Sequence, residues 1–177
     1  KSSNPRFQDA VVAIHAKLLP GAWINVLVVS HDPNRPPVMS GADLYDDLIM
    51  DHIKNARNYR ALDHADLKAT GFNPLCGDEL TVYLRIERER IEEVVFQCTC
   101  CGVSMASASI MTEIIKGKDT ADAGTIIRAF VAMLDGRADL ALQGATREQR
   151  AILATVQKFP ARTRCAALPW ATLEGAL

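Results

Sequence analysis

The chain of 177 residues has about the length of one domain, and its 49% hydrophobic and 23% charged residues exclude wholesale disorder. Lys and Arg number 20 and Asp and Glu 21, so the net charge of −1 does not indicate nucleic acid or an anionic membrane as a partner. No apolar run approaches the ~18 residues of a membrane helix. Without a recognisable secretory signal, we expect a cytoplasmic protein.

The first 38 residues differ from the rest of the chain. Their pattern predicts a helix at Asp9–Leu19 and a strand at Trp23–Val29, followed by a proline-rich linker ending at Pro37. Met39 resembles a natural translation start. We therefore expect an N-terminal extension that is an appendage or the product of an upstream start codon, and a domain at residues 39–177.

Beyond the linker the patterns become regular. Apolar residues spaced by four predict a helix from Asp43, as its cap, through His52, and the polar segment after it is expected to be irregular. Strict alternation at Leu80–Ile86, a charged turn and a second run at Ile91–Phe96 predict an antiparallel hairpin, and Leu67–Phe72 adds a short strand.

Four helices are predicted after the hairpin. A capping box at Thr146 and Gln149 opens one of them, and Gly117 and Gly136 stop two others. The expected ranges are Val103–Lys116, Asp119–Asp135, Thr146–Lys158 and Leu168–Leu177. This order predicts an α+β fold, with a small antiparallel sheet of about three strands packed against several helices.

The cysteines are the residues that best indicate the chemistry of this chain. An odd number of scattered cysteines makes a poor disulfide framework, so metal or thiol chemistry is favoured. Cys76 and Asp78 precede the first hairpin strand and Cys101 follows the second, so the hairpin brings them to one end of the sheet, with Cys101 at a helix N-terminus. Thiolates and a carboxylate suit zinc, and thiolates also suit iron–sulfur clusters. The five cysteines are Cys76, Cys98, Cys100, Cys101 and Cys165.

Other interpretations stay open at this point. A buried cysteine is often only a small apolar side chain. Cys98 and Cys101 have the spacing of a CxxC redox pair, although no thioredoxin-like βαβ pattern surrounds them. His52 is more typical of a packed or surface histidine than of a ligand. Arg162 and Arg164 flank Cys165. They could stabilise the negative charge of its thiolate or bind acidic residues of a partner protein, or they could simply be solvated at the surface.

These segments resemble the SufU branch of the NifU/IscU family of iron–sulfur cluster assembly proteins, over about residues 43–177. Ala56 replaces the proline of the family's DHYKNPRN segment, and Cys98 and Cys100 stand where the family usually has glycine. These two extra thiols leave open which cysteine binds metal, and they open a route to a local disulfide. The matching segments are Asp51–Asn58, Asn73–Asp78, Ser104–Met111, Lys158–Cys165 and Leu168–Trp170.

The resemblance implies a SufE/NifU-like fold and a metal site formed by Cys76, Asp78, Cys101 and Cys165. It implies that Cys76 is the catalytic acceptor of persulfide sulfur from a SufS-like, pyridoxal-phosphate-dependent cysteine desulfurase, with zinc in the site. Downstream iron–sulfur scaffolds or apo-proteins would receive the sulfur.

The alternatives are a scaffold that assembles and transfers a [2Fe–2S] cluster, and a structural zinc domain without turnover. IscU-type members usually have His directly before the third cysteine, where this chain has Arg164, and SufU-type members carry a longer stretch between the second and third cysteines. Both features favour the SufU branch.

Overall fold

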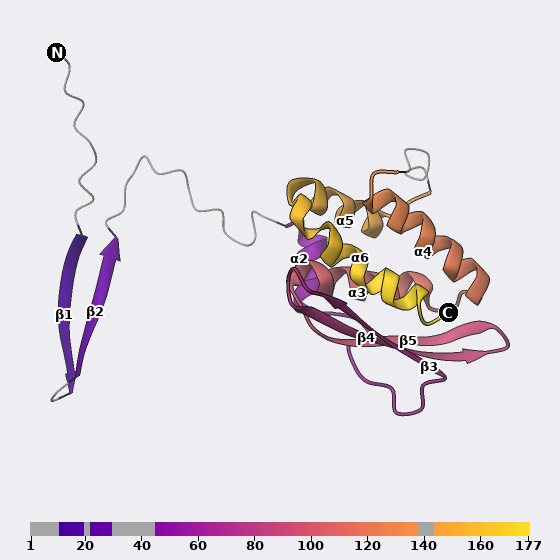
Figure 1. Cartoon of the computed structure of the whole chain (residues 1–177), viewed down its shortest axis with the longest axis horizontal. Helices are drawn as coiled ribbons and strands as arrows, with labels where there is room; N and C mark the ends of the chain where they lie inside the picture. Colours follow the sequence, from indigo (N-terminus) through magenta and orange to yellow (C-terminus); the bar gives the residue numbers. More distant parts are fainter. Residues whose placement is uncertain (1–10, 20–21, 30–44, 138–143) are drawn as a thin grey trace, which may run out of the picture. The chain divides into compact units, whose positions relative to one another are not determined.

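The computed structural model describes residues 11–19, 22–29, 45–137 and 144–177, and the chain divides into two compact units, Lys1–Val38 and Met39–Leu177 (Figure 1). In the first unit, strands β1 (Val11–Leu19) and β2 (Ala22–Val29) form an antiparallel hairpin. The strand at Trp23–Val29 is thus confirmed.

The prediction of a helix at Asp9–Leu19 is wrong, because this segment is a strand as far as the structure describes it. Valine and isoleucine favour strands, and the backbone register places Val11 opposite Val29. The linker at His31–Pro37 and the predicted helix cap Asp43 lie outside the described residues.

The second unit is built on a sheet with the strand order β3–β4–β5, all antiparallel. Alternate residues of β4, namely Leu80, Val82 and Leu84, are fully buried, because one face of the sheet is covered and the other is open. The predicted hairpin turn uses positive φ angles at Arg88 and Glu89. The strands are β3 (Leu67–Asn73), β4 (Asp78–Glu87) and β5 (Arg90–Thr99).

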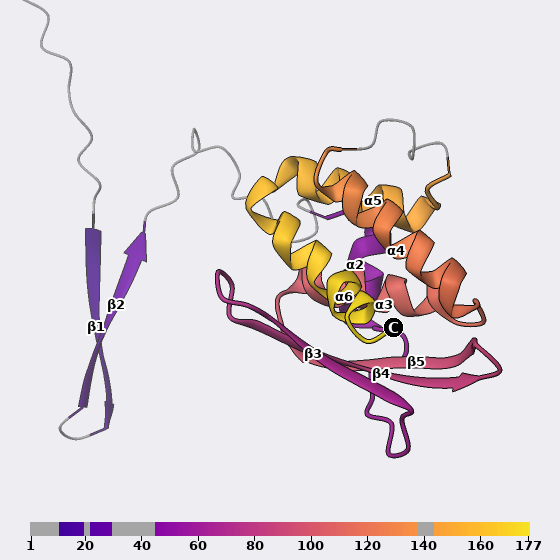
Figure 2. The ribbon, with the colours of Figure 1, turned by 45° about the vertical axis from the view of Figure 1, so that its right-hand side comes forward.

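The helices cover that one face (Figures 1 and 2). Helix α3 is almost entirely buried and packs between α2 and α6, which is why its sequence is rich in Ala and Ser. The helices are α2 (Asp47–Lys54), α3 (Gly102–Ile115), α4 (Thr120–Leu134), α5 (Arg147–Lys158) and α6 (Thr163–Glu174), with a 3₁₀ turn, η2, at Pro160–Arg162. The predicted α+β fold is confirmed. In the part of the chain that the structure describes, no helix is long and apolar enough to cross a membrane.

Two helix boundaries differ from the prediction. Asp46 caps α2, since its side chain accepts from the Leu48 N–H at 2.8 Å, whereas the capping box of α5 forms as predicted. Helix α6 begins at Thr163 rather than Leu168. Pro169, which favours a helix start, instead lies inside the helix and leaves one carbonyl without its N–H partner. Burial of the residues around it offsets that loss.

Helix α6 crosses β3 at a very close approach. A Cβ on Gly71 would lie 2.0 Å from Thr172 Oγ1 and 3.0 Å from Leu168 Cδ1. We expect Gly71→Ala to lower the free energy of unfolding by about 1–3 kcal/mol, because a well-packed contact must open. Gly175→Ala is the matched control, since its Cβ would meet atoms no closer than 3.6 Å. Urea unfolding of both variants tests this, and equal stability of the two would contradict it.

Candidate metal centre

The structure brings three of the four predicted ligands together. The Cys76 and Cys165 sulfurs and a carboxylate oxygen of Asp78 all lie within 4.8 Å of one another, and the two sulfurs are 3.0 Å apart. Cys76 lies in the turn between β3 and β4, Asp78 begins β4, and Cys165 is in the first turn of α6. The three side chains therefore converge from two segments far apart in sequence.

The turn that presents Cys76 has a clear local cause. The Asn73 carbonyl accepts from the N–H groups of Cys76 and Gly77, at 3.3 and 2.9 Å. Gly77 has φ of +70°, which a residue with a side chain adopts only at a cost. The chain can therefore reverse within a few residues and put Cys76 and Asp78 on the same side.

The buried carboxylate of Asp78 favours a positively charged ligand at this site. Its side chain is only 2% exposed, and Oδ1 accepts from the Cys101 backbone N–H at 2.9 Å. Its Oδ2 atom is buried with no hydrogen-bond partner among the described residues. A buried carboxylate oxygen without a partner is costly. A cation held between this oxygen and the two thiols removes that cost, so the residues present fit a metal such as zinc.

Cys101 stands apart from the close group. It is the N-cap residue of α3, and its backbone N–H fixes Asp78, but its sulfur does not belong to the trio within 4.8 Å. Its charge nevertheless acts on the site, as it contributes to the raised pKa of Cys165. Cys101 as the fourth ligand stays a prediction, as does the whole ligand set.

The surroundings of Cys165 shift the pKa of its thiol. Burial is the main cause that raises the pKa of Cys165 far above its usual value, with the hydrogen bond to Cys76 and the charge of Cys101 adding to it. Cys165 is therefore a neutral thiol here. A bound cation reverses this preference, because it stabilises the thiolate.

Two polar residues support the thiols. Arg162 Nη1 donates to Cys76 Sγ at 3.3 Å, and contacts with Cys165 and the charge of Cys101 raise the pKa of Arg162. Of the two arginines singled out in the sequence, Arg162 thus meets the site. Asn73 Nδ2 donates to Cys165 Sγ at 3.4 Å. Sequence reasoning missed this role of Asn73, although its place three residues before Cys76 was a signal.

The extra cysteines form a disulfide between Cys98 and Cys100, and Cys101 remains a free thiol. Cys98 is therefore paired with Cys100 and not with Cys101, as a CxxC redox pair would require. The local disulfide that the sequence allowed is present, directly before the N-cap of α3.

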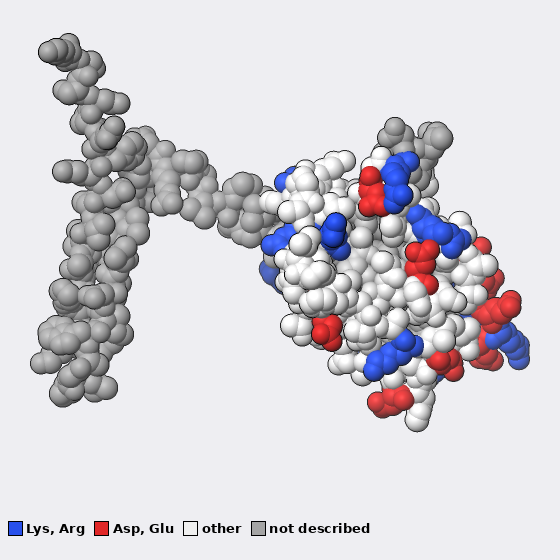
Figure 3. All heavy atoms as spheres, viewed as in Figure 1, with Lys and Arg blue, Asp and Glu red and all other residues white. Residues whose placement is uncertain are grey.

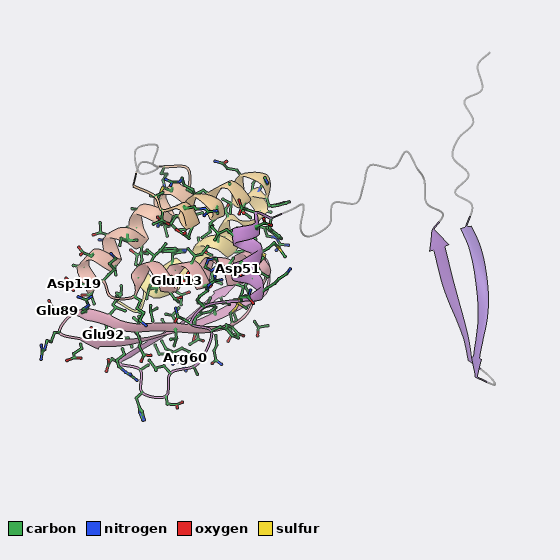
Figure 4. All side chains as sticks on the ribbon, turned by 180° about the vertical axis from the view of Figure 1, so that it is seen from behind. Asp51, Arg60, Glu89, Glu92, Glu113 and Asp119 are labelled. Carbon is green, nitrogen blue, oxygen red and sulfur yellow. A yellow bond between two sulfur atoms is a disulfide. The ribbon has the colours of Figure 1, made fainter. Side chains whose placement is uncertain are left out.

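His52 is part of the packing and not of the metal centre. It is 2% exposed, its Nδ1 lies 2.8 Å from Ser109 Oγ, and the Arg57 N–H also donates to that hydroxyl. Its Nε2 lies 3.8 Å from Glu113, which Figure 4 shows on α3 near Asp51 of α2. This explains the matched segment Asp51–Asn58 structurally, since it ties α2 to α3.

Acidification is expected to weaken the fold through His52. Burial, with the charge of Arg57 second, lowers its pKa below the usual 6.5, against the opposing charges of Glu113, Asp51 and Glu148. The unfolded chain therefore binds the proton more readily, so stability is full above about pH 6.5 and falls as the pH drops toward the lowered value. Urea unfolding at several pH values between about 7.5 and 5.5 measures this, and His52→Gln should flatten the dependence. An unchanged slope in that variant would contradict it.

Comparison with known proteins identifies the family of the chain. Residues 44–166 match the family model of the NifU-like N terminal domain. The chain belongs to this family. It is 39% identical to the zinc-dependent sulfurtransferase SufU of Bacillus subtilis over 140 residues, which is 74% of this chain and 87% of that protein. It is also 31% identical to the iron–sulfur cluster assembly scaffold protein IscU of Streptococcus pyogenes, over 76% of this chain and 82% of the relative.

Solved structures of the family agree in fold. The crystal structure of FiSufU from Fervidobacterium islandicum superposes with a TM-score of 0.68 at 29% identity, covering 77% of this chain and 98% of that one. A NifU-like N-terminal domain from Brucella abortus gives a TM-score of 0.65 at 20% identity. The predicted membership of the NifU/IscU family is thus confirmed, and the chain is an iron–sulfur cluster assembly protein.

Proposed function

We propose that this member of the NifU-like family is a zinc-dependent sulfurtransferase that accepts persulfide sulfur from a cysteine desulfurase on Cys76. The observation that carries the proposal is the buried Asp78 carboxylate, which lies within 4.8 Å of two thiols and whose Oδ2 has no hydrogen-bond partner among the described residues. Cys76, Asp78 and Cys165 would hold the ion, with Cys101 completing the set. When bound, zinc keeps its cysteine ligands deprotonated at neutral pH.

The residues around Cys76 suit a sulfur acceptor. Cys76 is half-buried in a turn whose neighbour Leu75 is 70% exposed, so a partner's persulfide can approach the thiol from solvent. Arg162 donates to the Cys76 sulfur and can stabilise its negative charge before and after it takes up sulfur. Asp78 and Cys165 are buried on the inner side and are suited to stay in place.

The charges on one face of the domain can be seen in Figure 3. On the face shown in Figure 3, positive and negative side chains are interspersed over the domain, with broad uncharged areas between them. Recognition of a desulfurase would involve local contacts at the Cys76 turn. Downstream iron–sulfur scaffolds or apo-proteins would take the sulfur onward.

The second candidate is a scaffold for a [2Fe–2S] cluster, as the IscU relatives are named. The same cradle of sulfur ligands could hold iron. Arg164 occupies the position that carries His in IscU-type proteins, and it favours the sulfurtransferase.

Metal and sulfide analysis with an ultraviolet–visible spectrum separates the two functions. About one zinc per chain, no acid-labile sulfide and a faster cysteine desulfurase on addition of the protein are expected. Iron with labile sulfide and visible absorption, and no effect on the desulfurase, would contradict the sulfurtransferase and favour the scaffold.

A further inference from the structure

Cys98 and Cys100, which are not among the candidate metal ligands, form a disulfide directly before Cys101. Cys98 lies near the end of β5, Cys100 lies in the link to α3, and their Cα atoms are 5.5 Å apart. Both residues are half-buried rather than sealed in the core. A reacting thiol can therefore reach them, which a redox-active pair requires.

The strand register places this pair beside the metal centre. Cys98 lies opposite the buried Leu80, and Asp78 lies two residues before Leu80, so Cys98 and Asp78 share the helix-facing side of the sheet. The disulfide keeps Cys100 on that side, one residue beyond the end of β5 and therefore opposite Asp78. Facing residues have Cβ atoms about 4.5–5.5 Å apart. The Cys76 sulfur lies within 4.8 Å of the Asp78 carboxylate, so it is a near neighbour of the pair.

A purely structural role explains this disulfide poorly. The stabilisation from a disulfide grows with the length of the loop that it closes. This one spans a sequence separation of only two. It lies at the end of a strand that β4 already holds by a full ladder. Its contribution to the fold is therefore small, while its position next to three free thiols is chemically significant.

We propose that Cys98 and Cys100, in their reduced form, release sulfide from a persulfide on Cys76. This activity rests on the proposed function, because it requires that Cys76 has accepted sulfur. The pair supplies two electrons from within the same chain. The disulfide in the structure is then the state of the pair after one release.

The chemistry proceeds in two balanced exchanges. The Cys100 sulfur attacks the inner sulfur of the Cys76 persulfide, a Cys76–Cys100 disulfide forms, and the outer sulfur leaves as hydrogen sulfide with the proton of the Cys100 thiol. The Cys98 sulfur then attacks Cys100, which forms the Cys98–Cys100 disulfide and returns Cys76 as a thiol with the second proton. One sulfane sulfur is reduced to sulfide, and two thiols are oxidised to one disulfide.

A dithiol reductant must reset the pair before another release. Cys98 lines a hollow of about 310 Å³ with Tyr59, Glu79, Thr81, Gln97 and Thr99 on the same part of the sheet. The Tyr59 hydroxyl donates to the Cys98 carbonyl at 3.1 Å and shapes this hollow next to the disulfide. Attack of the reductant on the Cys98 sulfur would free Cys100 first, which is the thiol that starts the next release.

A single-turnover experiment tests the release. The zinc-loaded full chain is reduced, freed of reductant under anaerobic conditions, and loaded with sulfur by a cysteine desulfurase and cysteine, which are then removed. Mass spectrometry of the alkylated protein measures sulfur on Cys76, and a sulfide assay measures release without added reductant. We expect about one sulfide per persulfide and one new Cys98–Cys100 disulfide.

Two serine variants separate the two exchanges. Cys100→Ser should accept sulfur and keep it, whereas Cys98→Ser should release sulfide once and accumulate a Cys76–Cys100 disulfide. Thr99→Ala keeps both thiols and is the matched control, expected to behave like the wild type.

The outcomes distinguish the two proposals. Reduced wild type that carries sulfur on Cys76 and retains it, or Cys100→Ser that releases sulfide as fast as wild type, overturns the release activity alone. Absence of sulfur on Cys76 in every variant overturns the sulfurtransferase and the release activity with it.

Discussion

Replacing Cys76 with alanine is expected to abolish sulfur acceptance and return cysteine desulfurase turnover to the rate of the enzyme alone. The thiol is the proposed nucleophile, and no other described thiol shares both its exposed turn and its contact with Arg162. Cys76 is half-buried at the edge of the core, so the fold should tolerate the change. Alanine formed from cysteine, at saturating acceptor, measures the effect.

Cys100→Ser is the matched control for this variant. It removes another half-buried thiol next to the same centre, and it should leave the first transfer of sulfur to Cys76 at the wild-type level. Circular dichroism of both variants checks the fold. Full stimulation by Cys76→Ala would exclude Cys76 as the acceptor and move the role to Cys101 or Cys165.

The sheet could be read from the sequence because its alternation has one cause. Leu80, Val82 and Leu84 are apolar since helices cover that face, and the residues between them are polar since the other face is open. The capping box at Thr146 is equally local, and it formed as predicted. Local rules succeed where the partner is a few residues away.

The failures have non-local causes. Asp9–Leu19 has apolar residues that suit a helix or a strand, and pairing with β2 decides between them. The start of α6 before Pro169 depends on burial against other helices, which no local signal shows. In both segments, tertiary contacts override the pattern of the segment itself.

The candidate site shows the same division. The hairpin predicted that Cys76, Asp78 and Cys101 would lie at one end of the sheet. No local pattern placed Cys165 beside them, and the family resemblance assigned it as a ligand. Its approach to within 3.0 Å of Cys76 depends on how α6 lies across β3, where Gly71 allows the close contact. A hydrogen bond from Cys101 to Asp78, rather than its sulfur, was the unforeseen contribution of that residue.

Asp78→Asn is expected to remove most of the bound zinc and with it the metal's share of stability. The amide can still accept from the Cys101 N–H through Oδ1, but an NH₂ group replaces Oδ2, and it can neither bind the ion nor balance its charge. Zinc present at about 1,000 times its Kd stabilises a fold by about 4 kcal/mol. For a domain of this size that is on the order of 10 °C in Tm.

Thermal unfolding with and without a chelator measures this share. Wild type should lose stability on chelation, whereas Asp78→Asn should already unfold like the chelated wild type and respond little further. Asp66→Asn is the matched control. Its Oδ2 likewise accepts a backbone N–H, from Ile86 near the far end of β4, but Asp66 is not among the clustered thiol and carboxylate groups. If Asp78→Asn retained a full complement of zinc and the wild-type response to chelation, Asp78 would not be a ligand, and the buried Oδ2 would need another cation or a water to explain it.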